Sequence, residues 1–163
     1  MSAALKSRTK WSEKLKRPEK PEIKPAPEKW AQKHGGNRML IPTPLLIQKL
    51  VKQIPSGKLT TMRLIRKKLA AEHQADFTCP LTTGIFLRIV AEAAEEARAE
   101  GQSEIPPYWR VVGDDGTLNP KFPGGIEQQK QYLQNEGFEI IPKGKKKWMV
   151  RDFELFLMAG DNL

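Results

Sequence analysis

The sequence predicts an α+β fold that is mainly helical, with a winged helix-turn-helix-like domain and a Pro/Lys-rich N-terminal arm. Three observations support this prediction: helical apolar periodicity between residues 43 and 100, an alternating hairpin pattern near the C-terminus, and a first stretch rich in lysine and proline. A period near 3.6 indicates helices that bury one face, whereas alternation indicates strands. We therefore divide the 163 residues into an arm, residues 1–42, and a domain, residues 43–163.

The arm contains KRPEKPEIKPAPEKW, in which prolines alternate with charged residues. Proline interrupts regular structure, and lysine and glutamate bury little surface, so we expect much of the arm to be extended or mobile. Trp11 and Trp30 do not fit a purely disordered arm, and we expect each to dock on the domain or on a partner. The stretch WSEKL, which begins at Trp11, can form a short helical turn.

The first two helices of the domain carry start signals. Thr43 can cap a helix that runs to Ile54, and Pro44 suits its first turn. Thr61 begins the second helix. The inward positions of that helix are Met62, Ile65 and Leu69, and its basic outer face is formed by Arg63, Arg66, Lys67 and Lys68.

The third helix opens at Thr78 and Pro80 and extends to about Glu100. Its apolar stripe consists of Leu81, Ile85, Phe86, Ile89, Val90, Ala93, Ala94 and Ala97. Because Leu81 belongs to this stripe, we expect its side chain to face the core. The second half of the helix is acidic on its outer face and would repel a duplex, so only the first turns can lie in a groove.

Short elements follow the third helix. We expect a strand over Arg110–Val112, a loop, and a helix IEQQKQYLQNEG that Gly137 closes. The stretch FEIIPKGKKKWMV predicts a β-hairpin around Lys143–Lys145, with Trp148 as a cross-strand anchor. The stretch RDFELFLMAG predicts a last short helix.

Positive charge is concentrated in the first part of the chain. Residues 1–40 contain 11 lysines and arginines against 4 acidic residues, whereas residues 41–163 contain 17 against 15. A basic tail attracts nucleic acid or other polyanions without sequence preference, although it can also serve only for solubility.

Several other classes of protein have little support in the sequence. The single cysteine, Cys79, excludes an internal disulfide, and neither it nor His34 and His73 has the spacing of a metal site. No apolar run reaches the roughly 20 residues of a membrane span, and the beginning lacks the apolar segment of a secretory signal. We expect a cytoplasmic protein without metal or cofactor. Cys79 precedes a helix, which lowers a thiol pKa, but a buried spectator is the expected role.

Four fragments carry a family resemblance. They are IPSGKLTT (Ile54 to Thr61), PYWRVV (Pro107 to Val112), the pair Gly124 and Gly125, and YLQNEG (Tyr132 to Gly137). In this order and spacing the chain resembles the C-terminal DNA-binding domain of methylated-DNA–protein cysteine methyltransferases and of the alkyltransferase-like proteins derived from it. The resemblance covers about Thr43 to Gly137. It implies a winged-helix domain that binds DNA and recognises alkylated DNA for repair.

The chain departs from the family at the reactive position. Tyr108 replaces the cysteine that accepts the alkyl group, Trp109 replaces the histidine that relays its proton, and Arg110 follows. A phenol with an ordinary pKa near 10 and no histidine beside it is a poor replacement for a thiolate, so the resemblance implies a member that is not catalytic. The family's orienting glutamate is kept as Glu136, which we expect to accept a backbone or tryptophan N–H. Tyr108 and Trp109 either stack on a nucleobase or fill a cavity that lost its function.

The family residues that rotate the target nucleotide are also replaced. Met62 stands for a tyrosine, and Leu81 stands for the arginine that fills the gap left by the base. Leu81 can still act as an apolar wedge, although its place in the stripe favours the core. The candidate nucleic-acid contacts are Thr61, Arg63, Arg66, Lys67, Leu81, Thr82, Thr83, Lys145 and Lys146.

The expected partner is nucleic acid, with duplex DNA as the first choice, and no membrane partner is expected, because no apolar run is long enough to span one. Two other hypotheses stay open. The fold can serve as a protein-interaction module whose N-terminal arm holds a protein partner, or the arm can associate with RNA or the ribosome.

Overall fold

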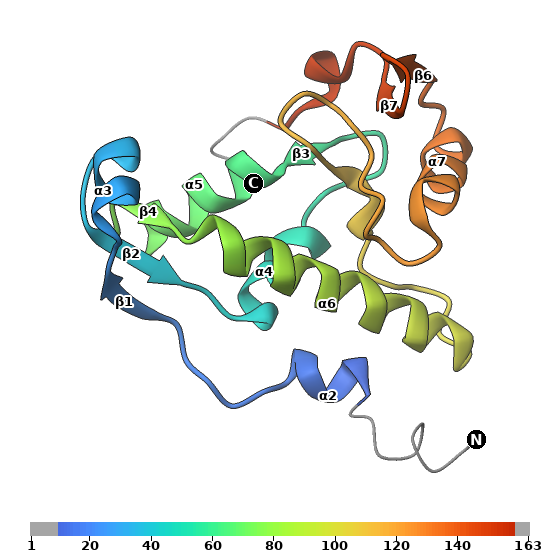
Figure 1. Ribbon diagram of the computed structural model, residues 1–163. Coiled ribbons are helices and arrows are strands. Elements are labelled where there is room, and N and C mark those ends of the chain that lie inside the picture. Colours follow the sequence, from blue (N-terminus) through green and yellow to red (C-terminus); the bar gives the residue numbers. More distant parts are fainter. Residues whose placement is uncertain (1–9, 159–163) are drawn as a thin grey trace.

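The computed structural model of the chain describes residues 10–158, in which helices predominate and strands are short (Figure 1). The helices are α2 (Trp11–Leu15), α3 (Glu28–His34), α4 (Pro44–Lys52), α5 (Met62–Glu72), α6 (Pro80–Ala99) and α7 (Gly125–Asn135). The strands are β1 (Glu22–Pro25), β2 (Arg38–Ile41), β3 (Thr60–Thr61), β4 (Phe77–Thr78), β5 (Val111–Val112), β6 (Ile140–Lys143) and β7 (Lys147–Val150). Two 3-10 turns lie at Tyr108–Arg110 and Phe153–Phe156. The predicted α+β class with mainly helical content is confirmed.

Helix α6 runs through the middle of the molecule, and α2, α4 and α5 pack against it (Figure 1). Leu87 and Val90 of α6 share one hydrophobic core with Ile47 and Val51 of α4 and Ile65 of α5, and each is at most 1% exposed. Burying such a side chain stabilises the fold by about 1.5–3 kcal/mol. These residues recur at helical spacing, which is why periodicity predicts the three helices correctly.

Both predicted helix starts in the domain are confirmed. The Thr43 hydroxyl accepts the Leu46 N–H at 3.3 Å, and the Thr61 hydroxyl accepts the Leu64 N–H at 3.2 Å. Each hydroxyl satisfies a first-turn N–H that has no partner within its helix, and such a cap is worth about 1 kcal/mol.

Three small sheets connect the helices. In the first, β2 pairs with β1 in antiparallel orientation and with β4 in parallel orientation. In the second, β3 pairs in parallel with β5, which places the start of α5 beside the segment that follows Tyr108. The third is the predicted hairpin of β6 and β7, in which Ile140 faces Val150 and Gly144 turns the chain with a φ of +68°.

Residues 10–41 differ from the predicted extended or mobile arm, because they form four elements that pack on the rest of the chain. The Glu96 carboxylate of α6 accepts the backbone N–H groups of Trp11 and Ser12, both at 3.1 Å, at the start of α2. Strand β2 adds to β4, and Met39 joins a small apolar cluster with Phe77. These tertiary contacts supply the burial that the Lys- and Pro-rich composition does not suggest. The helical turn at WSEKL is confirmed, and the division at residue 42 stays a prediction.

Three further expectations need correction. Leu81 is 63% exposed and Ile85 is 50% exposed, because α6 buries the opposite side, which passes through Thr83, Phe86 and Leu87. The expected strand at Arg110 begins one residue later, since residues 108–110 form a 3-10 turn. The last helix is a 3-10 turn over Phe153–Phe156, and the end of the predicted stretch lies outside the described residues. Within residues 10–158 no helix is long and apolar enough to cross a membrane.

Candidate nucleic-acid interface

Helix α5 presents the basic residues that the sequence predicted for its outer face. Arg63 and Lys67 are exposed, and Arg66 is half-buried. None of the three takes part in an ion pair within the part of the chain that the structure describes. The Arg63 backbone N–H donates to the Asp114 carboxylate at 3.1 Å, which anchors the start of α5. Basic side chains that are exposed and unpaired are suited to phosphate contacts.

The start of α6 combines two exposed apolar side chains with one buried and one half-buried threonine. Leu81 and Ile85 lie one turn apart and are both exposed. The Thr83 hydroxyl donates to the Cys79 carbonyl at 2.7 Å and is buried, and the Thr82 hydroxyl donates to the same carbonyl at 3.5 Å. Thr83 therefore holds the helix start in place, whereas Leu81 and Ile85 are free to contact a partner.

A cavity of about 220 Å³ lies beside the first half of α6. Its walls are mostly apolar and include Met62, Leu87, Val111, Val112, Leu118 and Phe122, with the polar residues Thr117 and Asn119. Its volume is below the roughly 300–1,000 Å³ of pockets for drug-sized ligands.

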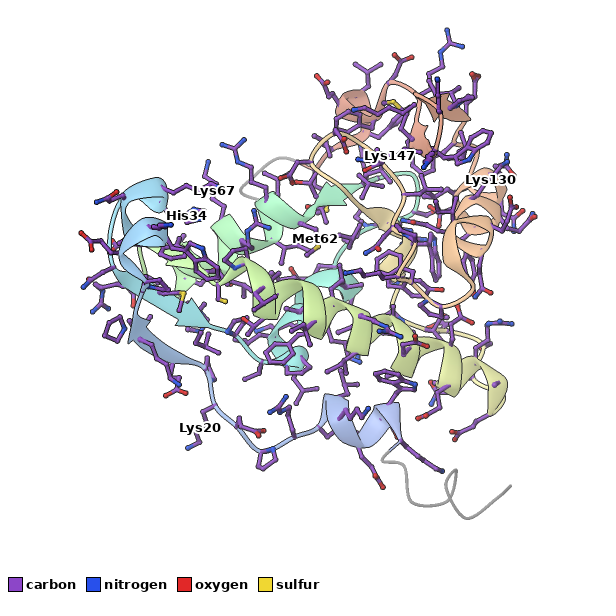
Figure 2. The ribbon with its side chains drawn as sticks, viewed as in Figure 1. Lys20, His34, Met62, Lys67, Lys130 and Lys147 are labelled. Atoms are coloured by element: carbon purple, nitrogen blue, oxygen red, sulfur yellow. The ribbon has the colours of Figure 1, made fainter. Side chains whose placement is uncertain are left out.

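Met62 joins the cavity to the exposed start of α6. It lines the cavity, and its Cε atom would lie 4.0 Å from a Cβ atom added to Gly84 of α6 (Figure 2). Leu81 and Ile85 flank Gly84 on the same helix. Exposed apolar side chains, a half-buried methionine and an apolar cavity therefore follow one another along this surface.

Tyr108 is fully buried and is held by a carboxylate. Its hydroxyl donates to Glu95 at 2.6 Å, and the Tyr132 hydroxyl donates to the same oxygen at 2.7 Å. The Arg98 guanidinium binds the other Glu95 oxygen at 2.7 Å, and the Gln128 amide reaches the Tyr108 hydroxyl at 3.5 Å. Glu95 thus accepts hydrogen bonds from three side chains. The Tyr108 hydroxyl is bound to it and is not accessible to a substrate.

Trp109 and Arg110 converge on the retained glutamate. The Trp109 indole N–H donates to Glu136 at 2.7 Å, as predicted, and the Gly57 backbone N–H donates at 3.1 Å. Arg110 forms an ion pair with Glu136 at 2.9 Å and donates to the Ile54 carbonyl at 2.7 Å. The side chains of Arg110 and Glu136 are 15% and 12% exposed, so this pair is largely removed from water. The glutamate therefore fixes the segment after Tyr108 to the turn before β3.

The pKa values in this region follow from burial and hydrogen bonding. Burial raises the pKa of Tyr108, and its hydrogen bond to ionised Glu95 raises it further. Burial and the same carboxylate raise the pKa of Tyr132 to about 12. Burial opposes ionisation of Glu136, but hydrogen bonds from Arg110 and Trp109 outweigh it and hold its pKa below the usual value. Both tyrosines are therefore neutral, and the carboxylate is ionised, at neutral pH.

Aromatic rings complete the packing of this region. The rings of Trp109 and Tyr132 stack with centroids 4.0 Å apart, and Phe122 meets Tyr108 edge to face at 5.1 Å. Of the two alternatives for Tyr108 and Trp109, the structure favours cavity filling, because they are 0% and 9% exposed and do not line the open cavity.

Two polar residues that sequence reasoning missed organise the site. Glu95 lies in the acidic half of α6, where a solvated side chain is the ordinary expectation, yet it binds both tyrosines. Gln129 of α7 is fully buried, donates to the carbonyls of Trp109 and Val111 at 3.1 Å, and accepts the Asn119 N–H at 2.7 Å. The only sequence signal for Gln129 is a polar residue on an inward position of a helix.

The β6–β7 hairpin holds the other predicted basic residues. Lys145 and Lys146 are exposed at its turn, whereas Lys143 is paired with Asp115 at 3.0 Å. The Lys130 ammonium of α7 lies 4.5 Å from the centre of the Trp148 ring, and Figure 2 shows Lys130 and Lys147 at the same end of the molecule. This end lies apart from the corner that holds Lys67.

The structure brings the predicted residues together in two groups. Tyr108, Trp109, Arg110 and Glu136 form a buried group, whereas the candidate contact residues lie at the surface, with Arg63, Arg66 and Lys67 on α5 and Leu81 and Thr82 in the first turn of α6. Thr61 and Thr83 are buried and serve as a helix cap and an anchor of the helix start. Cys79 is 4% exposed, as expected of a spectator, and within residues 10–158 no cluster of possible metal ligands is present.

A family profile described as "6-O-methylguanine DNA methyltransferase, DNA binding domain" matches residues 45–138, more than half of the chain. The chain therefore belongs to the family of 6-O-methylguanine DNA methyltransferase DNA-binding domains, in agreement with the four sequence fragments. Elements α2 to β2 and the β6–β7 hairpin lie outside the matched residues.

Two solved structures are similar to this chain. The crystal structure of S. pombe Atl1 in complex with damaged DNA containing O6-carboxymethylguanine has a TM-score of 0.50 at 19% identity, over 71% of this chain and 94% of that one. The crystal structure of S. pombe ATL in complex with DNA has a TM-score of 0.44 at 21% identity, over 69% and 91%. The likeness to Atl1 shows a shared fold. None of the curated protein sequences compared with this chain matches it.

Proposed function

We propose that this chain binds duplex DNA and recognises an alkylated base without removing the alkyl group. One observation carries the proposal: the acceptor position holds a fully buried tyrosine, Tyr108, while a separate apolar cavity beside the exposed start of α6 stays open. A protein whose acceptor position is buried and lacks a nucleophile, but which has a separate open cavity and exposed contact residues, is suited to binding rather than to transfer.

The family and the fold support DNA as the partner. The matched profile describes a DNA-binding domain, and Atl1, which shares the fold, was solved with DNA that contains O6-carboxymethylguanine. In this proposal Arg63 and Lys67 of α5 contact phosphates beside α6, and Lys145 and Lys146 contact phosphates from the hairpin. Such contacts position a protein on a duplex but carry no sequence information.

Recognition of the base then depends on the apolar surface. Leu81 inserts between base pairs and occupies the gap left by a rotated nucleotide, as apolar wedges do in other DNA-binding proteins. The rotated base enters the cavity past Met62. Extrusion of a base costs a few kcal/mol and costs least where pairing is already weakened, which favours a modified base over an intact one.

Titration of matched duplexes tests this proposal. One duplex carries guanine and the other carries O6-methylguanine at the same position, and each is titrated at several salt concentrations. We expect tighter binding of the modified duplex and a protein mass that stays unchanged after incubation with it. Equal affinity for both duplexes would refute base recognition, and a mass increase of one methyl group would refute the absence of transfer.

The same titrations distinguish the other classes of partner. Binding of duplex RNA as tightly as DNA would favour an RNA-associated protein. Absence of binding to any nucleic acid at low salt would favour a protein-interaction module, because electrostatic attraction to phosphates is strongest there.

A further inference from the structure

Helix α3 lies outside the residues that match the family profile and displays two unpaired lysines. Lys29 and Lys33 are four residues apart, which places them on one side of the helix, and both are exposed. Neither forms an ion pair within residues 10–158. The helix therefore presents positive charge that the fold itself does not use.

Contacts on both sides fix α3 to the domain. The antiparallel pair of β1 and β2 brackets the helix, and β2 continues the sheet to β4. The His34 ring stacks on Phe77 of β4 with centroids 4.4 Å apart and planes 16° apart, while Trp30 packs on the cluster that contains Phe77. At the turn into β2, the Asp76 carboxylate accepts the Arg38 N–H at 3.0 Å. A helix held in this way presents its lysines at defined positions, unlike a flexible tail.

The position of α3 places its charge beside the basic face of α5. The Thr78 hydroxyl of β4 donates to the Arg66 carbonyl of α5 at 2.8 Å, and the neighbouring Phe77 stacks on His34, so α5 and the end of α3 meet at the same strand. Figure 2 shows His34 and Lys67 at the same corner of the molecule. The side chains of α3 and α5 thus contribute to one positive surface.

This surface adjoins the start of α6. Strand β4, on which His34 stacks, ends at Thr78, and α6 begins at Pro80. In Figure 1, α3 lies near the N-terminal end of α6, and Leu81 belongs to the first turn of that helix. A duplex that meets Leu81 would therefore run close to α3.

We propose that Lys29 and Lys33 of α3 contact the phosphate backbone of the bound duplex and extend the binding surface beyond the helix pair that matches the family. The inference rests on the proposed DNA binding and adds to it a second, structured contact element. Duplex DNA fits this surface because its backbone is a continuous row of negative charge, and fixed lysines on adjacent helices can neutralise successive phosphates.

Removal of both lysines tests the inference. The variant K29A/K33A is compared with the unaltered chain in titrations at several salt concentrations, with the guanine and the O6-methylguanine duplex. Because each lost phosphate contact lowers the slope of log affinity against log salt by about one, we expect the slope to fall by about two. Both duplexes should lose affinity by the same factor, since phosphate contacts carry no base information. A hydroxyl-radical footprint should lose protection at one edge.

The variant K49A/K52A serves as the matched control. These exposed lysines of α4 are also unpaired within the described residues, and Lys52 lines a cleft beside the second half of α6, away from Leu81. We expect a slope close to that of the unaltered chain, and circular dichroism should show the same helical signal for both variants.

The possible failures are distinguishable. An unchanged slope and footprint in K29A/K33A would overturn this inference alone, and so would an equal effect of K49A/K52A. Absence of DNA binding by the unaltered chain would overturn the proposed function and, with it, this inference. If K29A/K33A lost affinity for duplex RNA but not for duplex DNA, the two lysines would contact RNA, and the inference about DNA would be overturned.

Discussion

Within the described residues, charged side chains are paired in the region around Tyr108 and unpaired on the surface formed by α3 and α5. Around Tyr108, the carboxylates of Glu95 and Glu136 each accept hydrogen bonds from several donors, and both side chains are 12% exposed. On the surface, Lys33 and Lys67 are exposed and have no acidic partner among residues 10–158. Charge in the first region holds the fold together, whereas charge in the second stays available for a polyanion.

This difference separates stability from binding. Removal of one partner of a buried ion pair leaves an uncompensated charge and is strongly destabilising, whereas exposed charges contribute little to folding. Variants of the buried region should therefore change the free energy of unfolding, and variants of the surface should change affinity at nearly constant stability.

The largest expected effect belongs to Glu136→Ala. The substitution leaves Arg110 without its ion-pair partner and removes the acceptor of the Trp109 and Gly57 N–H groups. We expect the free energy of unfolding to fall by about 3–5 kcal/mol, as measured by urea denaturation. The control is Glu139→Ala, whose ion pair with Arg151 has both side chains 59% exposed and should contribute less than about 1 kcal/mol. Similar losses for the two variants would remove the distinction between the regions.

Alkaline titration probes the same buried region without a substitution. The chain has only two tyrosines, and both donate to Glu95. The pKa of Tyr132 is raised to about 12, so its contribution to stability is present below the ordinary pKa near 10 and is lost as the pH rises toward 12. We expect no tyrosinate absorbance from the folded protein at pH 10.5, while the urea-unfolded protein should show it. Ionisation near pH 10 in the folded state would contradict the Glu95 network.

A smaller effect is expected for Tyr108→Phe. The variant loses one hydroxyl donor, but Glu95 keeps Tyr132 and Arg98, so the loss of stability should be about 1 kcal/mol. Because Tyr108 is fully buried, the ratio of affinities for modified and unmodified duplexes should stay constant. A change in that ratio would show that this position still contacts the base.

The sequence predicts elements well where local patterns decide the outcome. The helices α4, α5 and α6 follow from apolar periodicity with threonine caps, and the hairpin follows from alternation around Gly144. The strands β1 and β2 were not predicted, because each is only four residues long, β1 contains Lys24 and Pro25, and the two form only by pairing with each other and with β4. Local composition cannot reveal a partner that is distant in the chain.

The candidate site shows the same limit. The order of the four family-like fragments located Tyr108, Trp109 and Glu136. The Trp109–Glu136 hydrogen bond was expected because Trp109 stands where the family has the histidine that its glutamate orients. The role of Glu95 was not expected, because a glutamate in an acidic helical stretch gives the same pattern whether it is solvated or bound to tyrosines. Periodicity also placed Leu81 in the core, because apolar residues occur on two sides of this helix start and the pattern does not show that the side with Thr83 and Phe86 is the one that packs inward.

The smallest effect on stability, and the sharpest contrast with Glu136→Ala, is expected for Leu81→Ala. Leu81 is 63% exposed, so its removal should change the free energy of unfolding by less than about 0.5 kcal/mol. If Leu81 inserts into the duplex, burying it is worth about 1.5–3 kcal/mol, and the preference for the modified duplex should fall about tenfold. The slope of affinity against salt should not change, because no phosphate contact is lost.

The control for this last variant is Leu155→Ala, whose side chain is 75% exposed on the turn after β7. It should affect neither stability nor base preference, because exposure alone does not make a residue a wedge. If both variants lost the preference for the modified duplex, exposed leucines would contribute to it through nonspecific apolar contacts, and Leu81 would have no special role. If Leu81→Ala kept the preference for the modified duplex, the start of α6 would not recognise the base, and the cavity lined by Met62 would be the remaining candidate.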